Sequence, residues 1–205
     1  MSHNTMLFDL PAVTRMVPGM LGDLRSDHAG EAGAVMIYRG ILAGTRDPVV
    51  RRFAGDHLKT EQRHLEIMES LIPATARSLL LPLWRVAGWI TGFLPALVGA
   101  HAVYATIASV ERFVVTHYEH QIRKLPLEGS AGALRATLEV CQSDEAHHRD
   151  EAEARDREEM LDQTQRRDGA SGRGRGGRAS SAALRLWTTL VGLGSRYAVM
   201  AARRV

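Results

Sequence analysis

Apolar residues recur with the period of a helix in four stretches of this chain, and polar residues interrupt each repeat at a regular place. In two stretches the interruption is a glutamate followed three residues later by a histidine, Glu61/His64 and Glu145/His148. Residues three apart lie on one face of a helix, so each pair can hold a metal ion together. A carboxylate and an imidazole within a buried face are costly unless something binds them. The two stripes are Phe53, His57, Glu61, His64, Met68 and Leu71, and Leu134, Leu138, Cys141, Glu145, His148 and Ala152.

Two other helical stripes each carry a single glutamate, so four helices would each direct one glutamate inward. This pattern matches the arrangement described for ferritin-like di-iron carboxylate proteins. Asp144 and His147 form a competing pair on the last helix, but the apolar stripe favours Glu145 and His148. The additional stripes are Leu24, His28, Glu31, Val35, Tyr38 and Leu42, and Glu111 with Val115 and Tyr118.

The patterns predict an all-α fold, a ferritin-like four-helix bundle with a bent, apolar, membrane-associated segment and an extra C-terminal helix. Pro11 and Pro18 discourage one continuous helix at the start of the chain. Either Ser26 or Asp27 can cap the first bundle helix. The expected parts are a lead-in at residues 1–25, the di-iron bundle at 26–165, a flexible Arg/Gly-rich linker at 166–181 and an apolar helix at 182–205.

The segment around residues 79–103 is unusually apolar. Residues 86–110 contain no formally charged side chain, and at ~1.5 Å per residue they are long enough to cross a bilayer core of ~30 Å. A bent hairpin in the membrane interface, anchored by Trp84 and Trp89, fits better than a spanning helix or a buried core helix, although these alternatives stay open. The residues that argue against one continuous helix are Gly88, Gly92, Pro95 and Gly99.

Composition narrows the classes of function. The chain has 205 residues and a net charge of +3, and arginine supplies most of the positive charge. A single cysteine, Cys141, excludes an intramolecular disulfide framework and a cysteine metal cage. No phosphate-binding loop, dinucleotide fingerprint or nucleophile elbow is present. The short Arg-Gly tract is more typical of a linker than of an RNA-binding segment, so we do not expect a nucleic-acid partner.

Four short motifs carry a resemblance to a known family, the demethoxyubiquinone hydroxylases, which are di-iron monooxygenases of ubiquinone biosynthesis. The similarity extends from about residue 26 to 151 and, more weakly, over the last helix. The apolar run that begins at Pro82-Leu83-Trp84 resembles the family's membrane-facing segment. The motifs are Asp27-His28-Ala29-Gly30-Glu31, Glu61-Gln62-Arg63-His64-Leu65, Val110-Glu111 with His117-Tyr118 and Gln121-Ile122, and Glu145-Ala146-His147-His148-Arg149-Asp150-Glu151-Ala152.

The resemblance implies a site and a reaction. Two iron ions would be held together, with two of the carboxylates as bridges. The expected reaction is O₂-dependent hydroxylation of the quinone ring of a ubiquinone precursor, with NADH as the reductant. His117 and Tyr118 would relay electrons or place the quinone. The ligands implied by the family are Glu31, Glu61, His64, Glu111, Glu145 and His148.

Several neighbouring residues have a simpler interpretation than direct metal binding. We expect His28 and His147 to lie outside the ligand set, either behind it or in solvent. His57 is expected to be a core or surface histidine, and Cys141 a small core residue. Asp27 either orients a ligating histidine from behind or caps the helix.

The resemblance also implies partners and a location. These are a demethoxyubiquinone-type lipid substrate and peripheral attachment on the cytoplasmic side of a bacterial cell membrane. A lipid-delivery protein and a second copy of the chain, in a homo-oligomer, are further possible partners. Arg196 resembles a family arginine near the substrate channel, whereas the Arg-Gly tract and Arg112 depart from the family pattern. The alternatives are another ferritin-like di-iron oxidase or peroxidase and a non-catalytic lipid-binding bundle, which iron content would distinguish.

Overall fold

The computed structural model describes residues 9–169 and 176–205, with side chains at 9–165 and 182–205. Every regular element in this part of the chain is helical, which confirms the all-α prediction. The elements are α1 (Leu10–Met16), α2 (Met20–Gly44), α3 (Pro48–Leu71), the short 3₁₀ turn η1 (Ala74–Ala76), α4 (Leu81–Val98), α5 (Ala100–Ile122), α6 (Gly129–Gly169) and α7 (Gly176–Ala202).

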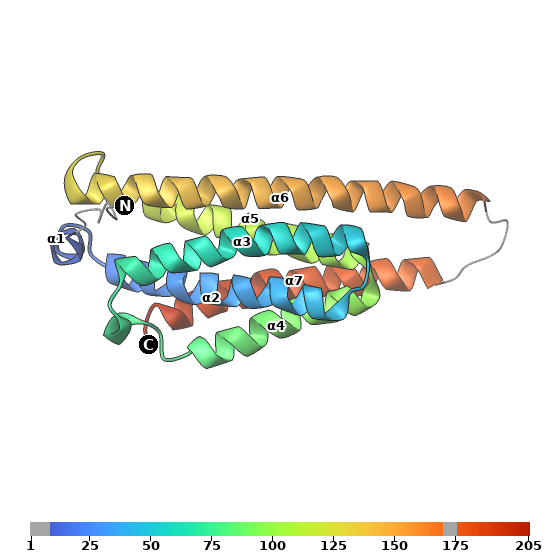
Figure 1. Cartoon of the computed structure of the whole chain (residues 1–205), viewed down its shortest axis with the longest axis horizontal. Coiled ribbons are helices and arrows are strands. Elements are labelled where there is room, and N and C mark those ends of the chain that lie inside the picture. Colours follow the sequence, from blue (N-terminus) through green and yellow to red (C-terminus); the bar gives the residue numbers. More distant parts are fainter. Residues whose placement is uncertain (1–8, 170–175) are drawn as a thin grey trace.

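Helices α2, α3, α5 and α6 carry the four predicted stripes and pack side by side. The long α6 borders one side of the molecule, and α4 borders the opposite side (Figure 1). Helix α4 packs along α2, and α7 packs against α5 and α2. Two apolar clusters fill the bundle, one around Leu24, Met68 and Leu134 and the other around Phe53 and Ile107. The stripes supply residues to both clusters.

The described part of the predicted lead-in is mostly helical, and, as expected, one continuous helix does not form, because residues 17–19 separate α1 from α2. Proline is tolerated in the first turn of a helix, where its missing N–H would have no partner. Pro11 therefore lies in the first turn of α1, and the Asp9 side chain caps this helix by accepting from the Ala12 N–H at 3.0 Å. Gly19, with φ of 87°, separates α1 from α2. Because α2 begins at Met20, Ser26 and Asp27 lie inside the helix and do not cap it.

Gly88 and Gly92 serve close packing and do not interrupt α4, whereas the expected break in the apolar run occurs at Gly99. A Cβ added at Gly92 would lie 1.9 Å from the Ile37 carbonyl oxygen, and one at Gly88 would lie 2.3 Å from the Gly33 oxygen. The backbones of α4 and α2 are thus in direct contact. Gly99, with φ of 137°, is the residue at which α4 ends and α5 begins.

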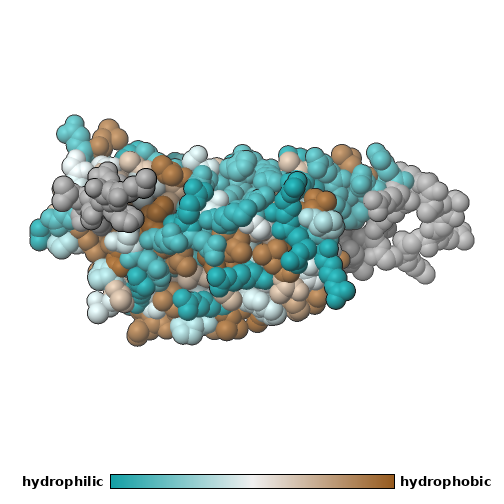
Figure 2. Space-filling view, in the orientation of Figure 1, coloured by the Kyte–Doolittle hydropathy of each residue, from teal (hydrophilic) through white to brown (hydrophobic). Residues whose placement is uncertain are grey.

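The outer side of α4 is exposed and apolar. Only 22% of this helix is buried, so the alternative of a buried core helix is wrong, and within the described residues it is the one helix long and apolar enough to cross a membrane. Brown side chains gather along the edge of the molecule over α4, whereas teal dominates over α3 and α6 (Figure 2). The exposed apolar residues of α4 are Leu83, Val86, Ile90, Leu94, Leu97 and Val98, and those of α7 are Leu186, Leu190, Leu193, Tyr197 and Met200.

The interval between the two helices on either side of the Arg-Gly tract is shorter than the predicted linker at 166–181. Helix α6 continues to Gly169, and α7 already begins at Gly176. The centre of the Arg-Gly tract, residues 170–175, lies outside the described residues.

Candidate metal centre and adjoining cavity

All six predicted ligand residues converge in the centre of the bundle. They form two groups in which the candidate ligand atoms lie within 4.8 Å of one another. Glu61 and Glu145 belong to both groups, which places them where bridging ligands would be needed. Each residue is at least 96% buried. The two groups are Glu31, Glu61, His64 and Glu145, and Glu61, Glu111, Glu145 and His148.

The register on α6 follows the apolar stripe. Glu145 and His148 are buried, whereas His147 is exposed, as expected. Asp144 is half-exposed, and its Oδ2 lies 3.1 Å from His64 Nε2. The competing residue therefore contacts a candidate ligand from behind instead of joining the cluster.

Contacts across the bundle tie α3 to α6. His64 Nδ1 lies 2.9 Å from Glu145 Oε1, and His148 Nδ1 lies 2.9 Å from Glu61 Oε1. The second contact lacks hydrogen-bond alignment. As a result, His148 Nδ1, both Glu61 oxygens and Glu145 Oε2 are buried without a hydrogen-bond partner. Unpaired buried carboxylate oxygens and an imidazole nitrogen are the donor set that a pair of cations would satisfy, so these residues fit a di-metal centre.

The protonation of the metal-free cluster reflects crowding. Burial raises the pKa of Glu31, Glu61 and Glu111, and repulsion from Glu145 adds to the effect. Burial also opposes ionisation of Glu145, but the imidazoles of His148 and His64 outweigh it and lower the pKa of this carboxyl to about 2. Burial disfavours the charged imidazoles, yet the carboxylates around them raise the pKa of His64 to about 10 and that of His148 to about 11. Protons bound to the imidazoles and carboxyl groups thus balance the negative charge of this metal-free cluster.

A cavity of about 390 Å³ connects the cluster with the exposed apolar helices. Small-molecule sites usually have volumes of ~300–1,000 Å³. Its walls come from α2, α4, α5 and α7, and the carboxyl groups of Glu31, Glu61, Glu111 and Glu145 lie at one border. The remaining wall is largely apolar or small, and includes Gly30, Gly33, Ile37, Trp84, Gly88, Val110, Phe113, Val114, Trp187, Leu190, Val191, Ala198 and Val199.

Comparison with known proteins identifies the family. Residues 21–168 match the family described as "Ubiquinone biosynthesis protein COQ7". The chain belongs to this family. The sequence resemblance to demethoxyubiquinone hydroxylases is thereby confirmed.

Similar proteins include three with informative names. A "NADPH-dependent 3-demethoxyubiquinone 3-hydroxylase, mitochondrial" from Dictyostelium discoideum is 35% identical over 132 residues, which cover 61% of this chain and 59% of the relative. A "3-demethoxyubiquinol 3-hydroxylase" from Rhodospirillum rubrum is 38% identical over 133 residues, covering 62% of this chain and 60% of the relative. Another protein of that name, from Paracidovorax citrulli, is 30% identical over 142 residues, covering 68% and 67%. The chain thus spans about three-fifths of the length of the first two relatives.

In this member of the COQ7 family, two tyrosines bind the outer carboxylates reciprocally. Tyr118 of α5 donates a hydrogen bond of 2.5 Å to Glu31 of α2, and Tyr38 of α2 donates one of 3.0 Å to Glu111 of α5. Burial raises the pKa of both phenols well above the ordinary value, so both remain donors. The predicted approach of Tyr118 to the cluster is observed. The role of Tyr38 was missed, although its place on the Glu31 stripe marked it as inward-facing.

His57 lies behind the cluster and belongs to neither group of candidate ligands, as expected. Its Nδ1 lies 3.1 Å from the Tyr38 hydroxyl, and its Nε2 lies 2.9 Å from Glu151 Oε2. The ring stacks on His148 with 4.0 Å between centroids. Burial, together with the charge of His148, lowers the pKa of His57 to about 4. His57 thus lies between the Tyr38 hydroxyl and the partly exposed carboxylate of Glu151.

Neither interpretation of Asp27 proved right, because this residue contacts no candidate ligand histidine and caps no helix. Its Oδ1 instead accepts a hydrogen bond from Gln121 Nε2 at 2.6 Å and lies 2.9 Å from His117 Nε2, which is itself 2.7 Å from Gln121 Nε2. His117 and Tyr118 both border the cavity, next to the carboxylates. A molecule in the cavity would therefore lie beside both residues as well as the carboxylates.

The other residues singled out in the sequence belong to neither group of candidate ligands. His28 is buried and does not face solvent; its Nε2 is 3.7 Å from Glu69 Oε1. Cys141 is a buried core residue whose thiol pKa is raised by burial. Arg112 is exposed and pairs with Glu153 at 2.7 Å. Arg196 is also exposed and is not part of the cavity wall.

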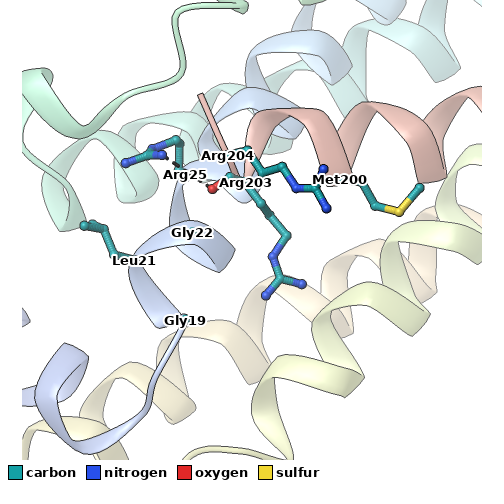
Figure 3. Close-up of a pocket in the computed structure, with 7 residues that line it drawn as sticks. All are labelled: Gly19, Leu21, Gly22, Arg25, Met200, Arg203 and Arg204. Carbon is teal, nitrogen blue, oxygen red and sulfur yellow. Dashed lines mark hydrogen bonds between the residues drawn. The ribbon is translucent and has the colours of Figure 1, made fainter.

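A second hollow, of about 530 Å³, lies where the start of α2 meets the end of α7. Figure 3 shows three arginines around it, Arg25, Arg203 and Arg204. Arg203 pairs with Asp23 at 2.8 Å, and Arg25 donates to the Ala76 carbonyl oxygen at 2.7 Å. The sequence patterns did not indicate this basic hollow, because its arginines come from opposite ends of the chain.

Proposed function

We propose that this protein is a monooxygenase that hydroxylates the ring of a demethoxyubiquinone-type lipid with O₂. The observation that carries the proposal is the apolar cavity, which joins a buried carboxylate–imidazole cluster to two exposed apolar helices. A lipid with a reactive ring needs both features, because its tail prefers apolar surroundings and its ring must reach the reacting centre. The names of the relatives support the same substrate class.

We further propose that the cofactor is a pair of iron ions. Glu31 and His64 would bind one ion, Glu111 and His148 the other, and Glu61 and Glu145 both. Oxygen and nitrogen ligands suit non-haem iron. When bound, such a pair supplies the electrons and the binding site with which O₂ is activated.

The residues of this chain would then orient the substrate and exclude water. Gly30 borders the cavity beside the carboxylates, and a Cβ added there would meet no atom within 4 Å, so this position leaves room for a ring. The hydroxyl of Tyr118 holds its proton at Glu31 Oε1 and so fixes that carboxylate at the cavity border. Apolar walls from α4 and α7 keep water from the ring and receive the tail.

A nicotinamide nucleotide is the proposed reductant. The sequence resemblance favours NADH, whereas the Dictyostelium relative is named NADPH-dependent. The arginines around the second hollow offer positive charge to the phosphates of such a nucleotide. Arg204→Ala should therefore raise KM for the nucleotide more than it lowers kcat, and assays with both nucleotides would identify the preferred one.

We also propose peripheral attachment to the cytoplasmic side of a bacterial membrane through α4 and α7. The sequences of α4 and of residues 182–205 contain arginines but no acidic residue, which favours an anionic surface. A lipid-delivery partner and a homo-oligomer stay predictions from the sequence.

The test is to purify the protein, count its iron and assay ring hydroxylation of a short-chain demethoxyquinone with either nucleotide. We expect about two irons per chain. Glu145→Ala and His148→Ala should lose iron while keeping helical circular dichroism. His147→Ala is the matched control, because this neighbouring histidine is exposed and should leave the iron unchanged. Unchanged iron in both ligand variants would refute the assigned centre.

Two alternatives predict different results in the same assay. A ferritin-like oxidase or peroxidase would contain iron but would not hydroxylate the quinone. A non-catalytic lipid-binding bundle would bind the quinone without containing iron. The continuity of the apolar cavity with the four carboxylates favours the hydroxylase over both.

A further inference from the structure

Asp27 presents an unusual carboxylate at the border of the cavity. Its side chain is fully buried, and Oδ1 accepts a hydrogen bond from Gln121 and lies 2.9 Å from His117 Nε2. Oδ2 is also buried but has no hydrogen-bond partner among the described residues. The carboxylate is thus held firmly through one oxygen, while the other is free to accept.

An unpaired buried carboxylate oxygen is energetically costly. Two donors of the chain near Asp27 are already committed, since Tyr118 donates to Glu31 and the Ser26 hydroxyl donates to the Asp23 carbonyl oxygen. A hydroxyl group on a molecule in the cavity would provide the missing donor. Trp84 also borders the cavity, and its buried Nε1–H has no hydrogen-bond partner among the described residues. This N–H could donate to a ring oxygen of the same molecule.

The oxidation state of a quinone ring determines whether it can satisfy Asp27. A quinol carries two hydroxyl groups and can donate a hydrogen bond to a carboxylate. A quinone carries carbonyl oxygens instead, which only accept and would be repelled by Oδ2. Trp84 does not distinguish the two forms, because both carry ring oxygens that can accept from its N–H.

We propose that Asp27 accepts a hydrogen bond from a ring hydroxyl and thereby selects the quinol form of the substrate over the quinone form. This inference rests on the proposed function. It addresses a difference between the relatives, whose names specify a demethoxyubiquinol in one case and a demethoxyubiquinone in the other. His117 and Gln121 act as positioning residues, because they orient the carboxylate through Oδ1.

The experiment measures binding of both redox forms to the full-length, iron-containing protein under argon, where O₂ cannot turn the quinol over. The probes are a short-chain demethoxyquinone and its chemically reduced quinol, and ultraviolet spectra of each mixture verify the oxidation state. Quenching of tryptophan fluorescence reports occupancy, because Trp84 and Trp187 border the cavity. We expect the wild type to bind the quinol roughly tenfold more tightly or better, the size typical of a hydrogen bond to a charged group.

Asp27→Asn tests the residue directly. The amide keeps the shape of the carboxylate but presents an N–H₂ group to the cavity, so the preference for the quinol should vanish or reverse. In turnover, KM for the quinol should rise more than kcat falls. Asp23→Asn is the matched control. Asp23 is a buried aspartate one turn earlier on α2, pairs with Lys124 and Arg203, and is not part of the cavity wall.

The outcomes separate this inference from the proposed function. Equal binding of both forms to the wild type, or an unchanged preference in Asp27→Asn, overturns the role of Asp27 and leaves the proposed function intact. Equal binding to the wild type would mean that water donates the hydrogen bond to Oδ2. This result does not depend on the folding of a variant. Absence of quenching by either form would instead overturn the proposed function, since the cavity would not take the ring.

Discussion

Two tyrosines with the same chemistry face different surroundings in this centre. Each donates to an outer carboxylate on the opposite helix, and each follows the glutamate of its own helix by seven residues. Tyr118 borders the cavity, whereas Tyr38 is backed by His57 and is absent from the cavity wall. The pair therefore allows the effect of a lost hydroxyl to be separated from the effect of proximity to the substrate.

Tyr118→Phe and Tyr38→Phe should each retain iron and fold, because only one hydroxyl is removed. Each leaves a buried carboxylate oxygen without its donor, which should cost about 1–3 kcal/mol of stability. Only Tyr118→Phe should slow reduction of the irons by the nucleotide in the presence of quinone, with hydroxylation falling in step. Iron analysis and stopped-flow reduction of both variants provide the measurement.

An equal slowing in Tyr38→Phe would contradict this distinction, and wild-type reduction in Tyr118→Phe would leave that residue as a core tyrosine. Glu111→Gln provides the opposite control, because it removes a ligand charge. Its iron occupancy should fall first, before any effect on the rate per bound iron.

The protonation of the cluster predicts that the stability of the metal-free protein falls as the pH rises, whereas the stabilisation by bound metal grows. His64 and His148 have folded pKa values of about 10 and 11, above the ordinary 6.5. Their contribution to stability is fully present below pH 6.5 and is lost as the pH rises through those values. The raised pKa values of Glu31, Glu61 and Glu111 act in the same direction above pH 4.5.

The metal-free protein should therefore lose stability between pH 6.5 and 8, by at most about 1.4 kcal/mol per pH unit for each histidine. Metal binding needs the deprotonated ligands and releases these protons. The increase in Tm produced by ferrous iron should accordingly be larger at pH 8 than at pH 6.5. Thermal unfolding under argon with and without iron measures both trends, and an iron-induced increase that shrinks with pH would disprove the assignment.

At the scale of elements, the contact between α2 and α4 depends on glycine. Gly92→Ala would place its methyl group 1.9 Å from the Ile37 carbonyl oxygen, so α4 must move away from α2. Overpacking of this kind typically costs about 1–3 kcal/mol. Gly55→Ala in α3 is the matched control: nothing lies within 4 Å of the added methyl group, and alanine is the better helix former. Urea unfolding should show destabilisation by the first and a gain of about 0.5–1 kcal/mol by the second, and equal effects would argue against the close contact.

Periodicity predicted the helices and the inward face of each helix, because residues three or four positions apart in the sequence determine both. Glu145 and His148 are buried and His147 is exposed for this reason. The pairing of Tyr38 with Glu111 depends on which helices become neighbours, and a single helical stripe contains no such information. The glycines of α4 were misjudged for the same cause. Gly88 and Gly92 weaken an isolated helix, but the cost is offset where another backbone comes into contact.

At the scale of the whole molecule, the exposed apolar surfaces of α4 and α7 predict attachment to vesicles. Leu83→Glu and Leu186→Glu should each reduce binding to anionic vesicles, since each places a charge on an exposed apolar face. Leu161→Glu is the matched control, because this leucine is also exposed but belongs to α6, the helix that borders the side opposite α4 (Figure 1). High salt should remove only the electrostatic part of binding. Cosedimentation measures all three variants, and an equal loss in Leu161→Glu would mean that the surface is not specific.

The linear order of the chain has a consequence for biosynthesis. All six proposed ligands lie between Glu31 and His148, whereas α7, which forms one wall of the cavity, begins only at Gly176. A ribosome therefore releases the complete set of carboxylates and imidazoles before the helix that covers this side exists. N-terminal parts of a chain generally fold first. We therefore expect this side of the nascent bundle to be open to iron before the last helix covers it.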